Sequence, residues 1–235
     1  MEKKDLNPSL TDHIVSGLKL GSNFIPIPGV GSVLSEIVGN IIPNQRIDRI
    51  ADYVKILNSK IECISNDIIQ KQLKNDQFID LVEESFIQAS RAISTDRKEY
   101  FAEIIKNGIS QEEIELIHSK HLMKILSELN DAEIIWLKYY LRSQADYENN
   151  FEEKNNEILA PIPVSKNTTA KEWNKSAIQN SYKDHLLRLQ LVEKKIKLDR
   201  KTKMPEYDNS GKIKTEPTRI TQLGRLLLQQ IGLNP

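Results

Sequence analysis

Apolar residues recur every three or four positions along most of the first 140 residues, which is the spacing of one face of an α-helix. The clearest run follows Asn44 and extends over three heptads, to about residue 72. Its alternating spacings of three and four are typical of a coiled-coil seam. We therefore predict one long helix over 44–72 that either forms the spine of a bundle or pairs with a second copy. The seam residues are Ile47, Ile50, Val54, Leu57, Ile61, Ile64 and Ile68.

Further helices are predicted on both sides of this run. The stretch 76–93 places Phe78, Val82 and Phe86 on one face. Asp96 resembles the start of a capping box for a helix that ends near Gly108, at the C′ position where glycine is favoured. Another helix opens at 110–113, and no strand pattern appears before residue 121. The fold class we predict is mainly α, with a helical bundle over residues 1–120.

An apolar segment punctuated by glycine and proline precedes the predicted long helix. Pro26 and Pro28 prevent a continuous helix in its first part, and Pro43 ends it. Its length is close to the minimum for a membrane span, but Glu36 and Asn40 argue against simple insertion. It is either a helix buried in the bundle or an element that can leave the bundle and enter lipid. The candidate membrane-active residues are Phe24, Ile25, Ile27, Val30, Val33, Leu34, Ile37, Val38, Ile41 and Ile42, and a stripe of small residues for close helix packing comprises Gly31, Ser35 and Gly39.

The pattern changes near residue 121, where we place a second domain, 121–235. A polar stretch over 146–171 predicts a loop, and the residues after it predict a helix at 173–189. Extended chain then leads into a charged hairpin whose turns lie at 199–203 and 208–211. A short strand at Ile220 returns to a last helix, capped by Thr221 and ended by Gly232.

Charge divides the chain in the same way. The full sequence of 235 residues carries 33 basic and 33 acidic side chains, but residues 1–163 have a net charge of −8 and residues 164–235 a net charge of +8. A basic C-terminal unit can meet nucleic acid, an anionic membrane or the acidic half of its own chain. No signal peptide is expected, and we predict a cytoplasmic protein that can associate with the inner face of the cell membrane.

The order of helices, strand, charged hairpin, strand and helix resembles a winged helix. The resemblance rests on His185-Leu-Leu-Arg-Leu-Gln-Leu-Val-Glu193 and on Ile220-Thr-Gln-Leu-Gly-Arg225. If such a unit binds DNA, its third helix enters the major groove and the hairpin meets phosphates. The alternative is a solvated basic hairpin. The nucleic-acid candidates are Lys183, Arg188, Lys195, Lys197, Arg200, Lys201 and Lys203, together with Lys175 and Gln179 on the third helix.

The N-terminal half resembles a different group of proteins. Ile25-Pro-Ile-Pro-Gly-Val-Gly31 and Ile42-Pro-Asn-Gln-Arg-Ile-Asp-Arg49, followed by a long helix, resemble the entry segments of HeLo and mixed-lineage-kinase-like cell-death bundles. Arg97-Lys-Glu-Tyr-Phe-Ala-Glu-Ile-Ile-Lys-Asn-Gly108, with the winged-helix-like end, resembles bacterial abortive-infection proteins of the alpha type. These resemblances imply a phage-defence or membrane-disrupting effector.

Residues suited to catalysis are few. The glycines at 29 and 31 lack the Lys-Ser/Thr of a phosphate loop, and no nucleophile elbow is present. His118, His121 and Glu115 are spaced to share a metal, but such trios arise by chance on acidic helices, so we predict no metal and no cofactor. The lone Cys63 is expected to be a small buried thiol beside the seam.

Three function classes therefore stay open. The preferred hypothesis is a non-enzymatic defence effector that acts on membrane lipid through residues 24–42 and responds to a protein trigger. The alternative is a DNA-binding regulator that dimerises through the helix at 44–72. The third class is a scaffold that binds another protein. We expect the protein to form a homo-oligomer.

Overall fold

A computed structural model of the chain describes residues 46–141, 150–162 and 168–233. Within these residues the protein is mainly helical, with ten helices and one small antiparallel sheet of two strands. The described chain divides into two compact units. Unit 1 contains residues up to 127 together with 230–232, and unit 2 contains 128–229 and Leu233.

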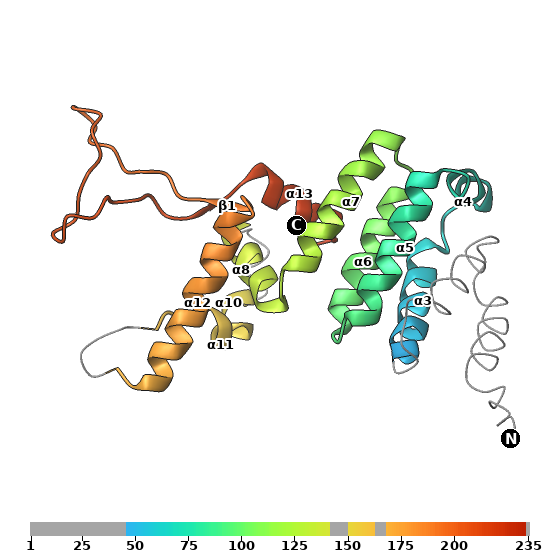
Figure 1. Cartoon of the computed structure of the whole chain (residues 1–235), viewed down its shortest axis with the longest axis horizontal. Helices are drawn as coiled ribbons and strands as arrows, with labels where there is room; N and C mark the ends of the chain where they lie inside the picture. The colour runs from blue at the N-terminus through green and yellow to red at the C-terminus, as the bar shows by residue number, and fades with distance from the viewer. Residues whose placement is uncertain (1–45, 142–149, 163–167, 234–235) are drawn as a thin grey trace, which may run out of the picture. The chain divides into compact units, whose positions relative to one another are not determined.

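Unit 1 is built from α3 (Ile47–Ile61), α4 (Asn66–Gln72), α5 (Asp76–Arg91), α6 (Thr95–Gly108) and most of α7 (Glu113–Glu128). The helix α3 packs against both α5 and α6, which also pack against each other (Figure 1). Short polar residues begin two of these helices. The Asn75 side chain accepts a hydrogen bond from the Gln77 amide at 3.0 Å, and Ser94 Oγ accepts one from the Arg97 amide at 3.3 Å. Ser94 therefore caps α6, and the prediction of a capping box that starts at Asp96 is wrong.

The core of unit 1 lies where the apolar faces of these helices meet. Tyr53 of α3 and Phe86 of α5 are both fully buried, with their rings edge to face and the ring centroids 5.1 Å apart. Phe78 and Val82 on the same face of α5 are also buried, as their spacing predicts. Ile93, which continues that spacing, lies beyond the end of α5 and is 85% exposed.

Gly108 ends α6 at the predicted place, but not by the predicted means. Among the described glycines only Gly211 and Gly232 have a positive φ, so Gly108 does not act as a left-handed C′ residue. A Cβ atom at Gly108 would lie 3.2 Å from a Leu81 methyl carbon and 3.4 Å from a Leu116 methyl carbon. The missing side chain therefore lets the end of α6 approach α5 and α7 closely.

The single long helix predicted over 44–72 is wrong, because the chain forms two helices there. The helix α3 ends at Ile61, and the Ile64 amide donates to the Ile61 carbonyl at 2.9 Å in the turn that follows. Ser65 then has an extended backbone, with ψ 134°, at the position before α4. Ser65, Asn66 and Asp67 are residue types that favour a helix start, and this local preference prevails over the heptad spacing.

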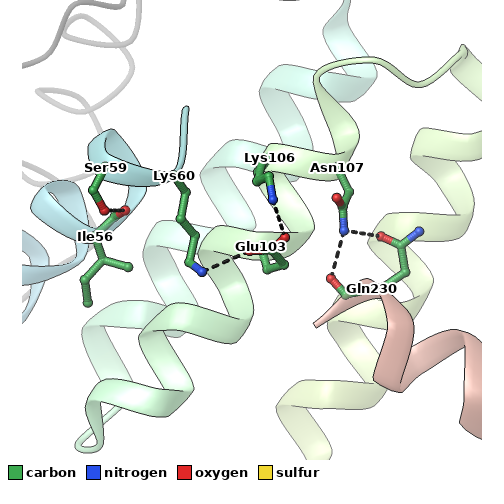
Figure 2. A network of polar contacts seen from close by, with 7 residues as sticks. All are labelled: Ile56, Ser59, Lys60, Glu103, Lys106, Asn107 and Gln230. Carbon is green, nitrogen blue, oxygen red and sulfur yellow. Dashed lines mark hydrogen bonds and ion pairs between the residues drawn. The ribbon is translucent and has the colours of Figure 1, made fainter. Parts of the chain in front are cut away.

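Ion pairs and amide contacts hold α3, α6 and the segment 230–232 together within unit 1 (Figure 2). Glu103 of α6 binds the Lys60 ammonium at 2.9 Å and the Lys106 ammonium at 2.7 Å. Burial acts to raise the pKa of Glu103, but hydrogen bonds from Lys106 and Lys60 outweigh it and hold the pKa below its usual value. The Asn107 amide donates to the Gln230 backbone carbonyl at 3.1 Å.

In unit 2 the helices α8 and α12 pack against a small sheet. It contains α8 (Asp131–Leu141), α10 (Phe151–Lys154), α11 (Asn156–Leu159), α12 (Ala170–Arg188), β1 (Val192–Glu193), β2 (Arg219–Ile220) and all but the last residue of α13, Gln222–Gln230. The helix α8 packs against α12 and β2, and Val192 pairs with Ile220 in the antiparallel sheet. The prediction of an unbroken loop over 146–171 is wrong, because α10 and α11 form within its described part.

Two features fix the start of α13 against the sheet. The Thr221 hydroxyl accepts a hydrogen bond from the Gly224 amide at 3.1 Å and donates to the Gln190 carbonyl at 2.7 Å. A Cβ atom at Gly224 would lie 2.3 Å from the Leu191 carbonyl oxygen, so only glycine fits there. At the other end Gly232, with φ +75°, ends the helix as predicted.

Candidate nucleic-acid interface

A long arm, residues 193–219, joins the two strands of unit 2. It leaves at β1, returns at β2 and divides into two tips (Figure 1). Its chain segments pair through three isolated bridges, Ile196 with Thr215, Leu198 with Pro205, and Tyr207 with Ile213. No residue between 193 and 219 is buried. The arm therefore owes its shape to backbone pairing and turns, because it has no core of its own.

Glu206 holds the point where the arm divides. Its amide donates to the Lys197 carbonyl at 2.9 Å, and its carbonyl accepts from the Lys214 amide at 2.8 Å. Its carboxylate lies 3.0 Å from the Lys197 ammonium and 3.8 Å from the Lys214 ammonium. Glu206 therefore joins the segment around Lys197 to the segment around Lys214 through both its backbone and its side chain.

Tip 1, residues 199–204, is a turn organised by one carboxylate. Asp199 Oδ1 accepts hydrogen bonds from the Thr202 amide at 2.7 Å and the Lys201 amide at 2.9 Å. The Asp199 amide donates to the Met204 carbonyl at 2.9 Å, and Lys203 has a left-handed backbone with φ +57°. The hydrogen bond from the Thr202 amide is the main cause that lowers the pKa of Asp199. The carboxylate therefore stays ionised and is engaged by its own turn.

Tip 2, residues 208–212, repeats this design. Asp208 Oδ1 accepts from the Ser210 hydroxyl at 2.7 Å and from the Lys212 amide at 2.9 Å. The Ser210 hydroxyl is the main cause that lowers the pKa of Asp208, and the Lys212 amide adds to it. Gly211 has φ +79° with nothing near its Cβ position, so glycine is needed there for its backbone conformation and not for space.

The cations of the arm fall into two groups. The arm carries nine Lys and Arg residues against five Asp and Glu residues. Four of these cations lie along its shaft in ion pairs with arm carboxylates, and these pairs are Lys195 with Glu193, Lys197 with Glu206, Lys214 with Glu206, and Arg219 with Glu216. The other five form no ion pair within the part of the chain that the structure describes, and they are Lys194, Arg200, Lys201, Lys203 and Lys212.

Three of these five cations, Arg200, Lys201 and Lys203, gather on tip 1, and all three side chains are exposed. The only acidic residue of this tip, Asp199, accepts three hydrogen bonds from within the turn. Tip 1 is thus a fixed turn that presents three positive charges to solvent. The structure brings these three predicted residues together and sets Lys195 and Lys197 apart from them on the shaft.

The six residues that the three bridges join share one face of the arm. Residues paired in a bridge lie on the same face, and neighbours along a strand point to opposite faces. This rule places Ile196, Leu198, Pro205, Tyr207, Ile213 and Thr215 on one face, which we call the apolar face. Four of these side chains are large and between 46% and 57% exposed, and they belong to Ile196, Leu198, Tyr207 and Ile213. The ion-paired residues Lys197, Glu206 and Lys214 occupy the opposite face.

Two of the candidates on the predicted recognition helix, α12, are engaged within unit 2, although most residues of the helix are exposed. Gln179 is buried, and its amide donates to the carbonyls of Ile158 at 2.7 Å and Ala160 at 3.0 Å. The Lys183 ammonium lies 4.3 Å from the centroid of the Trp136 ring. Burial is the first cause that lowers the pKa of Lys183, followed by repulsion from Lys194. Lys175 and Arg188 are exposed.

The remaining predicted residues lie elsewhere. The candidate membrane-active segment 24–42, with Gly31, Ser35 and Gly39, lies outside the described residues. Of the predicted seam, Ile50, Leu57 and Ile61 are buried within unit 1, whereas Ile68 is 48% exposed. Across residues 46–141, 150–162 and 168–233, no helix is both long and apolar enough to cross a membrane.

The candidate metal ligands and the cysteine are placed as follows. His118 and His121 are exposed on α7. No three metal-ligating side chains come together in the described parts of the chain. Cys63 is exposed in the turn after α3, so the expectation of a buried thiol is wrong.

Sequence reasoning missed the apolar face and two of the unpaired cations, Lys194 and Lys212. A sequence signal for the apolar face was present, because apolar and charged residues alternate from Lys195 to Asp199, which is the pattern of a strand.

Comparison with known proteins finds no family model, curated protein or solved structure that matches this chain.

Proposed function

We propose that this protein binds nucleic acid through the arm of unit 2, with the cations of tip 1 on the phosphate backbone. The observation that carries the proposal is the set of three exposed cations, Arg200, Lys201 and Lys203, on one fixed turn whose single carboxylate, Asp199, forms no ion pair with them. Lysine and arginine side chains supply most of the affinity of proteins for nucleic-acid backbones, because their binding releases condensed counterions.

The rigidity of tip 1 favours binding. Asp199 accepts three hydrogen bonds from residues 201 and 202, and two backbone hydrogen bonds close the turn. Because the backbone is already ordered, only side-chain freedom is lost when the cations meet a phosphate chain. The Asp199 carboxylate adds negative charge, but it is directed into the turn and does not pair with the cations beside it.

The architecture of unit 2 supports the proposal as well. The described order is α8, α10, α11, α12, β1, arm, β2 and α13, and our proposal draws on the winged-helix interpretation of this unit, in which the hairpin meets phosphates. The arm, more than α12, supplies the contacts in our proposal, because Gln179 and Lys183 are engaged within unit 2. The proposal does not include dimerisation through 44–72, which is not one helix.

The test is a binding titration of the full chain with a labelled 20-base-pair duplex over a range of salt concentrations. The tip variant combines Arg200→Gln, Lys201→Gln and Lys203→Gln. If these side chains neutralise three phosphates, the slope of log K against log salt concentration falls by about 2–3 in the variant. The affinity in low salt falls by about 10-fold to 100-fold.

A matched control removes the same charge from unit 1. It combines Lys55→Gln, Lys71→Gln and Lys124→Gln, three exposed lysines without an ion pair in the described chain. The control is expected to keep the slope and affinity of the natural sequence. Equal losses in both variants would show that only net charge matters, and absence of binding by the natural chain would refute the proposal.

A further inference from the structure

One histidine of unit 2 is oriented by a buried carboxylate. His185 of α12 and Glu133 of α8 form a hydrogen bond in which Nδ1 lies 2.7 Å from Oε1. The Glu133 side chain is 5% exposed, and the His185 side chain is 20% exposed. Because a carboxylate can only accept hydrogen bonds, the proton of the neutral imidazole resides on Nδ1. The contact therefore leaves Nε2 as the nitrogen that carries a lone pair.

Glu133 is itself held in place, because its second oxygen is engaged as well. Glu133 Oε2 accepts a hydrogen bond from the Asn130 amide at 2.8 Å, and the Glu133 amide donates to Asn130 Oδ1 at 2.9 Å. These reciprocal hydrogen bonds cap the start of α8. A carboxylate that is fixed in this way keeps the imidazole bound to it in one tautomer and one orientation.

The lone pair of Nε2 has no partner in the described protein. His185 forms no further hydrogen bond or ion pair with residues 46–141, 150–162 and 168–233. An imidazole that is oriented through one nitrogen can attack an electrophile with the other. The Glu133 carboxylate then compensates the positive charge that the ring gains in the reaction.

The charge next to His185 indicates the class of electrophile. Arg188 follows His185 at the i+3 position in the last turn of α12, so the two residues share a helix face. Its side chain is exposed and forms no ion pair in the part of the chain that the structure describes. A guanidinium group matches the oxygens of a phosphoryl group, so this cation favours an anionic phosphoryl donor over an uncharged electrophile.

We propose that His185 is a phosphoryl-acceptor site, which takes a phosphoryl group on Nε2 from a small donor such as an acyl phosphate or phosphoramidate. Nε2 forms a bond to phosphorus with its lone pair, and the bond from phosphorus to the leaving group breaks. The leaving group keeps the electron pair of that bond and departs as a carboxylate or, from protonated phosphoramidate, as ammonia. The Nδ1 proton stays in its hydrogen bond with Glu133. This inference is independent of the proposed function.

The test treats the full chain with potassium phosphoramidate near neutral pH. Mass spectrometry of peptides kept in alkaline solution then follows the phosphorylation of each histidine. His118 and His121 are internal controls, because both are exposed on α7 and neither contacts a carboxylate in the described ranges. We expect His185 to react about tenfold faster than either control, although it is less exposed. An equal or slower reaction at His185, or a product on Nδ1, would overturn the inference.

A variant of the carboxylate tests its positioning role. Glu133→Gln is expected to slow phosphorylation of His185 by about tenfold and to leave the two control histidines unchanged. The matched control, Glu172→Gln, alters the capping box of α12, in which the Thr169 amide donates to Glu172 Oε2 at 2.8 Å, and should keep the rate at His185. Nitrogen NMR should show one His185 tautomer in the natural chain and a mixture in Glu133→Gln. A single tautomer in both proteins would contradict the role of Glu133, and if this variant does not fold, the comparison among histidines of the natural chain decides.

A second pair of variants tests the class of donor. Arg188→Gln is expected to slow the reaction of His185 with phosphoramidate by about twofold to fivefold and to leave its reaction with uncharged diethyl pyrocarbonate unchanged. Lys171→Gln removes an exposed charge near the start of the same helix and should change neither rate. Reaction of His185 with diethyl pyrocarbonate but not with phosphoramidate would overturn the assignment to phosphoryl donors. Failure of the natural chain to bind duplex would refute the proposed function and leave this inference intact.

Discussion

The bundle of unit 1 and the arm of unit 2 both carry apolar residues at regular intervals, with opposite results. In α5 the interval of three and four places Phe86 in the core, where it is fully buried against Tyr53. In the arm the interval of two places Tyr207 on a face where it is 57% exposed. The interval determines which side chains share a face. Burial depends on a second element that covers the face, and no residue of the arm is buried in this way.

The largest expected effect separates these two aromatic residues. Phe86→Ala removes a fully buried ring and is expected to lower the free energy of unfolding by about 3–5 kcal/mol. Tyr207→Ala removes an exposed ring and is expected to change it by less than about 0.5 kcal/mol. Urea unfolding followed by far-UV circular dichroism measures both changes. Similar losses in the two variants would contradict the contrast between core and arm.

A pair of glycines extends the comparison to the backbone. Gly224→Ala places a methyl group against the Leu191 carbonyl and is expected to lower the free energy of unfolding by about 1–3 kcal/mol. Gly211→Ala has open space but a strained φ, and is expected to loosen only tip 2, at about 1 kcal/mol. Thermal unfolding detects the first change, and hydrogen exchange at amides 208–212 detects the second. A larger fall in thermal stability for Gly211→Ala than for Gly224→Ala would contradict this prediction.

The smallest expected effect concerns two carboxylates whose pKa values are both lowered. Glu103→Gln removes an acceptor of two lysines and is expected to lower the free energy of unfolding at pH 7 by about 1 kcal/mol. A lowered folded-state pKa means that the carboxylate stabilises the fold above its unfolded pKa of about 4.3. This stabilisation is lost as the pH falls through the lowered folded-state pKa. The difference between variant and natural chain should therefore disappear in acid.

Asp199→Asn is the matched change in the arm. The lowered pKa of Asp199 arises within tip 1, which packs on no core, so the variant should unfold like the natural chain at both pH values. Chemical unfolding at pH 7 and at pH 3 compares all three proteins. Persistence of the Glu103→Gln difference at pH 3 would show that the ion pairs with Lys60 and Lys106 are not its cause.

Most helices could be predicted from the sequence because their signals are local. Thr221 caps α13 and Gly232 ends it, as expected, whereas α6 is capped by Ser94, two residues before the predicted Asp96. The two turns of the arm were equally predictable, because an aspartate followed by small or polar residues stabilises such turns without help from distant residues. The described residues therefore confirm the mainly helical class.

Other features depend on distant contacts, and sequence reasoning missed them. The heptad spacing continues through Ile64, so it hides the break before Ser65. The division of the arm depends on Glu206 pairing with both Lys197 and Lys214, which no local pattern reveals. The same pairing separates the shaft lysines from the unpaired cations of tip 1. The membrane-active role of 24–42 stays a prediction.

The short segment 230–232 gives the chain an unusual connectivity. Unit 1 is discontinuous, because the polypeptide leaves it at residue 127 and rejoins it about a hundred residues later, after completing unit 2. A fragment that stops at 127 would leave the Asn107 amide without its acceptors on Gln230. Ribosomal synthesis therefore delivers residues 230–232 only after unit 2 has been made, so the contact between Asn107 and Gln230 is a late addition to the helical bundle.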